Sequence, residues 1–134
     1  QLVLGSEQVP FANSKIGPAA PPIRTPAGWL TVFHAVDKYE EWELPSWHGG
    51  WKKRYTAGLM LLDLNEPWKV AGISREPLLA PEAPYELEGY RGSVIFPCGL
   101  VPEADGSVKI YYGAADTVVA LATARLEDLI ALCR

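Results

Sequence analysis

The chain has 134 residues, 49% of them hydrophobic and 21% charged, which is an ordinary composition for one globular domain. A formal net charge of −4, with Lys52-Lys53-Arg54 as the nearest thing to a basic cluster, argues against a nucleic-acid ligand. No apolar stretch approaches the roughly 18 residues that a membrane span needs. Twelve glycines, twelve prolines and five tryptophans instead indicate short strands joined by turns.

The N-terminal residues and the two cysteines indicate in which cellular compartment the protein is expected. Gln1-Leu2-Val3-Leu4 lacks the basic start and long apolar region of a signal peptide, and with no initiator Met we expect the chain to be incomplete at this end. Cys98 and Cys133 have no Cys or His neighbour at metal-ligand spacing, so we expect no metal site and two reduced thiols in a cytoplasmic protein. Cys98 stands in an apolar run and is expected to be a small buried residue.

The first half of the chain predicts strands around one long loop. Four prolines between residues 17 and 27 exclude a helix there and favour extended backbone. The β-branched and aromatic residues of 29–34 predict a strand. Residues 37–54 are expected to form a polar loop, followed by a second strand over 55–62.

The second half continues the same pattern. Asp105-Gly106 is a hairpin turn signal, and Pro97 is expected to kink the strand that contains it. Apolar positions 126, 129, 130 and 132 predict a short terminal helix. The predicted segments, in order, are a short strand at 70–73, an acidic connection at 81–88, strands at 93–101, 108–113 and 117–123, and the helix at 126–132.

One sequence pattern occurs twice. Residues 28–35 and 106–113 each begin with a turn glycine, alternate apolar residues, and end with two ring-bearing residues and a small one. Repeated sheets of this kind are typical of β-propeller blades. The chain has room for about two blades, whereas a closed propeller needs about four or more. We therefore expect an uncovered apolar face, and with it self-association or pairing with a missing N-terminal half.

Several motifs in order carry a resemblance to a known family. They are Ser14-Lys15-Ile16-Gly17-Pro18, Gly28-Trp29-Leu30, Phe33-His34, Tyr55-Thr56-Ala57-Gly58, Leu62-Asp63-Leu64, Val94-Ile95-Phe96-Pro97-Cys98-Gly99 and Tyr111-Tyr112-Gly113-Ala114-Ala115-Asp116-Thr117. From about Ser14 to its C-terminus the chain resembles glycoside hydrolase family 130, the β-mannoside phosphorylases and some β-mannosidases. The resemblance implies an all-β fold that is part of a five-bladed β-propeller, about two blades with a short C-terminal helix. Residues 1–134 would be its C-terminal part, with the N-terminal blades absent.

The same resemblance implies inverting phosphorolysis of β-mannosides with release of α-mannose 1-phosphate. Inversion needs an acid on one side of the sugar and a nucleophile on the other. The nucleophile is inorganic phosphate, a co-substrate rather than a cofactor, so a cationic, hydrogen-bonding cradle replaces the second carboxylate. The family motifs map the phosphate cradle onto Lys15, His34 and Tyr55 and a sugar-site carboxylate onto Asp116. The general acid is expected upstream, which leaves no catalytic residue in this chain.

Each of these residues also has a structural interpretation when taken alone. Lys15 could be a surface lysine, His34 a satisfied core histidine and Tyr55 a packing residue, and Asp116 could serve only a hairpin turn. It is their joint occurrence, in order, that favours function.

Two tryptophans of the long loop are further candidates for binding substrate. Trp47 and Trp51 could stack on a sugar ring at the acceptor end or cover a small core of the loop itself, and both possibilities stay open. His48, between them, is expected to be exposed and inert.

Three functions fit these patterns. The first is part of a β-mannoside phosphorylase, with a β-mannoside or manno-oligosaccharide and phosphate as partners and with neither nucleic acid nor membrane. The second is a β-mannosidase of the same family, in which water replaces phosphate. The third is a non-catalytic half-propeller that binds sugar or another chain. Retention of Lys15, His34 and Tyr55 together favours phosphorolysis.

Overall fold

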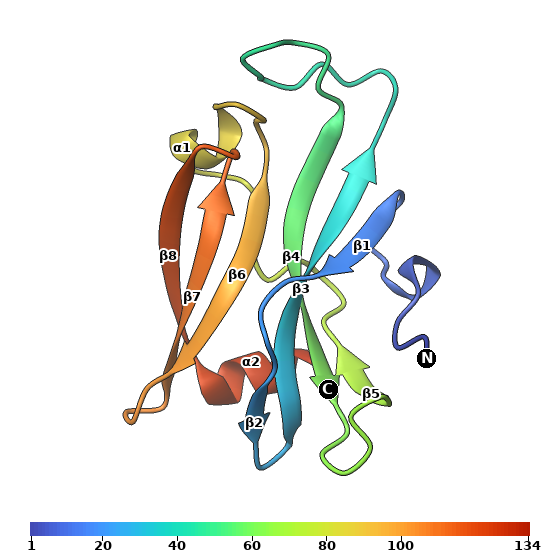
Figure 1. Ribbon diagram of the computed structural model, residues 1–134, viewed down its shortest axis with the longest axis vertical. Helices are drawn as coiled ribbons and strands as arrows, with labels where there is room; N and C mark the ends of the chain where they lie inside the picture. The colour runs from blue at the N-terminus through green and yellow to red at the C-terminus, as the bar shows by residue number, and fades with distance from the viewer.

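The computed structural model describes residues 1–134 as two antiparallel sheets that pack against each other (Figure 1). The first sheet contains β1 (Lys15–Pro18), β2 (Ile23–Thr25), β3 (Gly28–Lys38), β4 (Lys53–Leu62) and β5 (Val70–Ile73). The second contains β6 (Ile95–Pro102), β7 (Ser107–Ala114) and β8 (Val118–Arg125). A 3₁₀ turn η1 (Ser6–Gln8) precedes the sheets, α1 (Pro84–Leu87) connects them, and α2 (Leu126–Leu132) follows them.

The long strands β3 and β4 form the centre of the first sheet. They pair without interruption from Trp29 opposite Leu62 to Lys38 opposite Lys53. On the other side of β3, β1 pairs with one half and β2 with the other. The proline-rich stretch between β1 and β2 breaks what would otherwise be one strand, because proline cannot donate a ladder hydrogen bond.

The sequence repeat corresponds to a structural repeat. Its two copies become β3 and β7, and each is a strand with partners on both sides. Each copy starts at a glycine with positive φ, Gly28 at 145° and Gly106 at 85°, a conformation that side chains disfavour. The expected hairpin at Asp105-Gly106 is present, and the register shifts between Pro97 and Gly99 as the predicted kink requires.

The main core lies between the sheets. Leu30 and Val32 of β3, with Leu59 and Leu61 of β4, pack against the second sheet and α2. The residues that they meet are Leu100, Val108, Ile110, Leu129 and Cys133. The opposite face of the first sheet is covered by the N-terminal segment, which places Val9 against Phe33 and Ala35.

The mostly β architecture, the two sheets and the terminal helix agree with the expected part of a propeller, and three local features differ. Cys98 is exposed rather than buried, because side chains alternate along β6: Ile95 and Pro97 are buried, and Cys98 points to the opposite face, where its Sγ donates a hydrogen bond to the carbonyl of Tyr111. A one-turn helix, α1, interrupts the acidic connection, and η1 occupies part of the segment before β1. None of the helices has the length and hydropathy to span a membrane.

Candidate functional site

The candidate site lies where the apolar stripe of β3 ends. Side chains alternate along a strand, so His34 and Val36 continue the face that carries Leu30 and Val32. Leu30 and Val32 are fully buried in the core between the sheets, whereas His34 is only half-buried. The polar site is therefore built directly on the end of the hydrophobic core.

Lys15, His34 and Tyr55 come together on this face from three adjacent strands. Lys15 of β1 and Tyr55 of β4 both pair with Val36 of β3, one on each side, and cross-strand partners share a face. Lys15 Nζ lies 5.9 Å from the centroid of the Tyr55 ring. The centroids of the His34 and Tyr55 rings are 5.7 Å apart. An ammonium, an imidazole and a phenol ring are thus neighbours on this face.

Gly17 makes room for the imidazole. It pairs with His34 across β1 and β3. A Cβ at position 17 would lie 2.4 Å from both Cε1 and Nε2 of His34, closer than any real contact. The glycine of the Ser-Lys-Ile-Gly-Pro motif is thus required by the position of the histidine rather than by a turn.

The electrostatic setting of His34 favours the neutral imidazole. Burial and, to a smaller extent, the nearby Lys15 ammonium lower the pKa of His34 from its ordinary 6.5, against an opposing hydrogen bond to the backbone at Pro18. The buried Nδ1 atom of His34 has no hydrogen-bond partner. Lys15 has no carboxylate within 4 Å, so its charge is free to meet an anion.

The second sheet adds an aromatic ring that the sequence did not single out. Phe96 of β6 stacks on His34 with ring centroids 4.7 Å apart and lies 6.2 Å from the Tyr55 ring. A parallel bridge between Tyr55 and Val94 holds the two sheets together at this point, and Figure 1 shows β6 running beside β4. The alternation in Val94-Ile95-Phe96 predicts a strand but not which ring Phe96 meets, because that contact crosses between sheets.

The two tryptophans of the long loop, residues 39–52, are placed differently. Trp51 lies almost parallel to the Tyr55 ring, at 16° and 6.2 Å, and its Nε1 donates to the carbonyl of Gly92. Trp47 is 66% exposed and meets Tyr90 edge-on. Trp51 therefore adjoins the three-residue cluster, whereas Trp47 lies at the outer surface of the loop. His48 is exposed, as expected, and touches Tyr90.

Asp116 occupies a hairpin turn, the position expected if it served only the turn. It is exposed between β7 and β8, and both Ala115 and Asp116 have φ of 51°. Two successive positive φ values are typical of a type I′ turn, and a hydrogen bond from the Thr117 amide to the Ala114 carbonyl closes this one. The Ala115 carbonyl accepts from the Arg91 amide, which ties this turn to the segment that adjoins Trp51.

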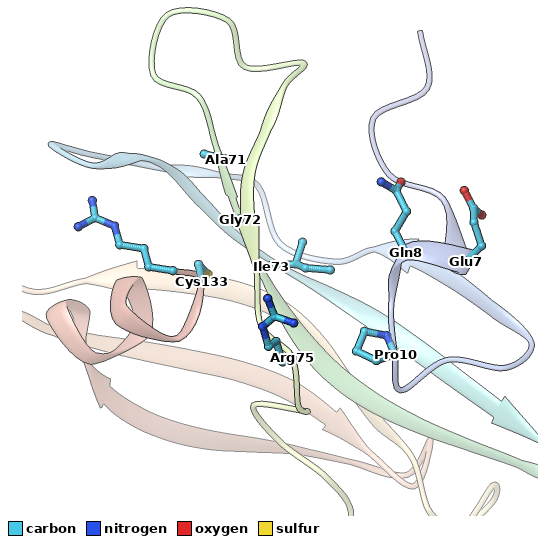
Figure 2. A pocket seen from close by; sticks show the side chains of 9 residues that line it. Glu7, Gln8, Pro10, Ala71, Gly72, Ile73, Arg75 and Cys133 are labelled. Carbon is cyan, nitrogen blue, oxygen red and sulfur yellow. The ribbon is translucent and has the colours of Figure 1, made fainter.

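The largest cavity is not at this cluster. It has a volume of about 580 Å³ and lies between η1, β5 and the end of α2 (Figure 2). Figure 2 shows Gln8, Arg75 and Cys133 at its border. Its wall contains none of Lys15, His34 and Tyr55, and oppositely charged side chains such as Glu7 and Arg75 are spread along its rim. We assign the candidate site to the cluster, where an unpaired cation and two ring donors converge.

The two sheets fit part of a β-propeller, and on one face they bring an unpaired lysine together with a histidine and several aromatic rings. The model of the glycoside hydrolase 130 family, described as β-1,4-mannooligosaccharide phosphorylase, matches residues 2–134. The chain belongs to this family.

Named relatives agree with this assignment. The β-1,4-mannooligosaccharide phosphorylase of Ruminococcus albus is 39% identical over 121 residues, 90% of this chain and 33% of that protein. The 1,2-β-oligomannan phosphorylase of Thermoanaerobacter sp. is 36% identical over 119 residues, 89% of this chain and 36% of that protein. The structure of the Listeria innocua β-1,2-mannobiose phosphorylase bound to β-1,2-mannobiose superposes with a TM-score of 0.75 at 31% identity. That alignment covers 92% of this chain and 31% of that one. The chain thus spans about a third of the length of these relatives.

Proposed function

We propose that this chain supplies part of the phosphate and sugar site of an enzyme that cleaves β-mannosides by inverting phosphorolysis. One observation carries the proposal: Lys15, His34 and Tyr55 share one face of three adjacent strands, with the lysine charge unpaired. An ammonium and two hydrogen-bonding rings suit a phosphate dianion, since charge-assisted hydrogen bonds are the stronger ones. The three relatives described above are each named as a phosphorylase, which supports this choice.

In the proposed reaction, inorganic phosphate is held by these three residues and acts as the nucleophile. A phosphate oxygen bonds to the anomeric carbon of the mannosyl group while the bond from that carbon to the glycosidic oxygen breaks on the opposite face. A general acid contributed from outside these 134 residues protonates the departing oxygen. The products are α-mannose 1-phosphate and the shortened acceptor, and phosphate is consumed as co-substrate with no further cofactor.

The sugar would lie beside the cluster, toward the long loop and the β7–β8 turn. Asp116 is proposed to accept hydrogen bonds from sugar hydroxyls, since its exposed carboxylate is free of any ion pair. Trp47 and Trp51 would lie on the acceptor side. Of the two, Trp47 has the more accessible ring for the apolar face of a pyranose.

We further propose that residues 1–134 are the C-terminal part of a five-bladed propeller. The first sheet is covered on both faces, but Tyr111, Val119 and Leu121 lie exposed on the outer face of the second sheet. Because the relatives are about three times as long, we infer that this face packs against a sheet from the part of the protein outside these residues. The free thiols Cys98 and Cys133 support a reducing, cytoplasmic location.

The test is product analysis on the full-length enzyme that carries this segment. With phosphate and β-mannosides it should release mannose 1-phosphate, and Lys15→Ala should raise the KM for phosphate. Lys69→Ala, at an exposed lysine already paired with Glu66 beyond the other end of β4, should not. Release of free mannose at a rate independent of phosphate would identify the hydrolytic alternative instead. Turnover by the isolated 134-residue chain would contradict the inference that the general acid lies elsewhere.

A further inference from the structure

Arg91 has an unusual environment for an arginine so close to the candidate site. Its guanidinium carbon lies 5.1 Å from the centroid of the Trp51 ring and 4.9 Å from that of the Tyr90 ring. None of the five ion pairs in the structure includes Arg91. The side chain is half-buried and held by aromatic faces rather than by a carboxylate.

Arg91 also connects the long loop to the segment that precedes β6. Its Nη1 donates a 3.1 Å hydrogen bond to Ser46 Oγ, and Ser46 Oγ donates to the carbonyl of Tyr90. Ser46 and Arg91 form a backbone bridge, and the Gly92 amide donates to the carbonyl of Pro45 at 2.7 Å. These bonds fix the loop at residues 45–46, a few residues before Trp51.

Trp51 connects the fixed part of the loop to Tyr55 of the site. Its Nε1 donates to the Gly92 carbonyl at 2.8 Å, and its ring lies nearly parallel to that of Tyr55. Tyr55 in turn adjoins Lys15 and His34. A continuous series of contacts therefore leads from Arg91 through Trp51 to the phenol of the anion cluster.

We propose that Arg91 is a positioning residue that holds Trp51 against Tyr55 and so sets the orientation of the Tyr55 phenol for phosphate. This inference rests on the proposed phosphorolysis. Arg91 itself does not contact phosphate in this arrangement, and it acts on the site through Trp51 and Tyr55. Arginine suits this position because its planar group stacks on aromatic faces while donating hydrogen bonds at its edge, which lysine cannot reproduce.

The experiment measures phosphate dependence in the full-length enzyme at saturating mannoside. In Arg91→Ala, the loss of the cation–aromatic contact with Trp51 should raise the KM for phosphate by roughly 3- to 30-fold. The KM for mannoside and kcat at saturating phosphate should change little. Arg91→Lys should be intermediate. Arg24→Ala, at an exposed arginine of β2 near the other end of β3, is the matched control and should behave as wild type.

A double-mutant cycle separates positioning from a general loss of stability. In a Trp51→Ala background, Arg91→Ala should raise the phosphate KM little further, because the contact that it serves is already gone. Equal effects in both backgrounds, or an unchanged phosphate KM in folded Arg91→Ala, would overturn the proposal. If Arg91→Ala does not fold, Arg91→Lys with and without Trp51→Phe provides the same comparison.

Wild-type turnover that does not need phosphate would refute the proposed function and this inference together. Phosphate-dependent turnover with an unaffected Arg91 variant would refute this inference alone.

Discussion

Gly17 and His34 illustrate how one small residue determines where a functional side chain lies. The imidazole lies against the backbone of Gly17, where any Cβ would overlap two of its ring atoms. The pairing of these residues across β1 and β3 means that neither can move without disturbing the sheet. The position of the imidazole relative to Lys15 and Tyr55 therefore depends on a residue that itself contributes no functional group.

The first residue-scale prediction is that Gly17→Ala impairs phosphate binding more than folding. The added methyl should displace the His34 ring from the cluster and remove a hydrogen bond to phosphate. Such a loss corresponds to about a 10- to 100-fold increase in the KM for phosphate, measured by initial rates in the full-length enzyme. Gly113→Ala is the control, because a Cβ there meets only ordinary contacts at 3.8 Å. A wild-type phosphate KM in Gly17→Ala would contradict the prediction.

The second concerns the charge on His34. The Lys15 ammonium contributes to the lowered pKa of His34, so Lys15→Gln should raise that pKa toward 6.5. A pH titration of the imidazole resonances by NMR measures the change directly, and no change or a further decrease would be inconsistent with the observed geometry. The lowered pKa also has a consequence for stability. The unfolded chain binds this proton more readily, so the folding contribution of His34 falls as the pH decreases below 6.5.

At the scale of elements, α1 is anchored by a buried acidic residue. Glu86 accepts a 2.9 Å hydrogen bond from the Tyr112 hydroxyl of β7, and its other oxygen accepts from the amides of Glu82 and Ala83. Burial and the contact with Glu86 raise the pKa of the Tyr112 phenol, which keeps it a donor. The one-turn helix is too short to persist by itself, so this bond holds the connection between the sheets in place.

Tyr112→Phe should therefore destabilise the protein by about 1.5–3 kcal/mol, the usual contribution of a hydrogen bond to a charged group. Chemical denaturation of the full-length protein measures the effect. Tyr111→Phe, in the adjacent exposed position of the same strand, serves as the control and should change the free energy of unfolding by less than about 0.5 kcal/mol. Equal effects of the two substitutions would show that the bond to Glu86 is not what holds α1.

At the scale of the whole molecule, the two sheets differ in how well they are covered. Val119 is 78% exposed and lies on the outer face of the second sheet, opposite the core between the sheets. β8 also has an unpaired edge, since it pairs only with β7. An open edge next to an apolar face is a common starting point for association.

The isolated 134-residue chain is therefore expected to self-associate through this face when the rest of the enzyme is absent. Size-exclusion chromatography with light scattering should detect oligomers, and Val119→Asp should shift the distribution toward the monomer because it places a charge on the interface. Thr123→Asp, on the same face of the same strand but outside the apolar group, should have a smaller effect. A well-behaved monomer of the unaltered chain would contradict the prediction.

Much of the architecture was predictable because it depends on local signals. Alternation, turn glycines and prolines predict the strands β3, β4 and β7 and the Asp105-Gly106 hairpin, and periodicity predicts α2. The burial of Cys98 was predicted wrongly because an apolar neighbourhood in the sequence does not show which face of a strand a side chain occupies. Pro97 is buried, so alternation places Cys98 on the opposite, exposed face. The helix α1 escaped prediction because a single turn has almost no periodicity to detect.

What the sequence by itself determined is the family, the succession of strands and the identity of Lys15, His34 and Tyr55 as candidates, since these depend on residue type and order. Only the tertiary structure decided that these three share one face and meet Phe96 of the second sheet, and that Gly17 leaves space for the imidazole. It also decided that Arg91 lies over Trp51 and that Trp51 adjoins Tyr55. The physical reason is that register and sheet packing bring together residues far apart in the chain, and neither leaves a local pattern in the sequence.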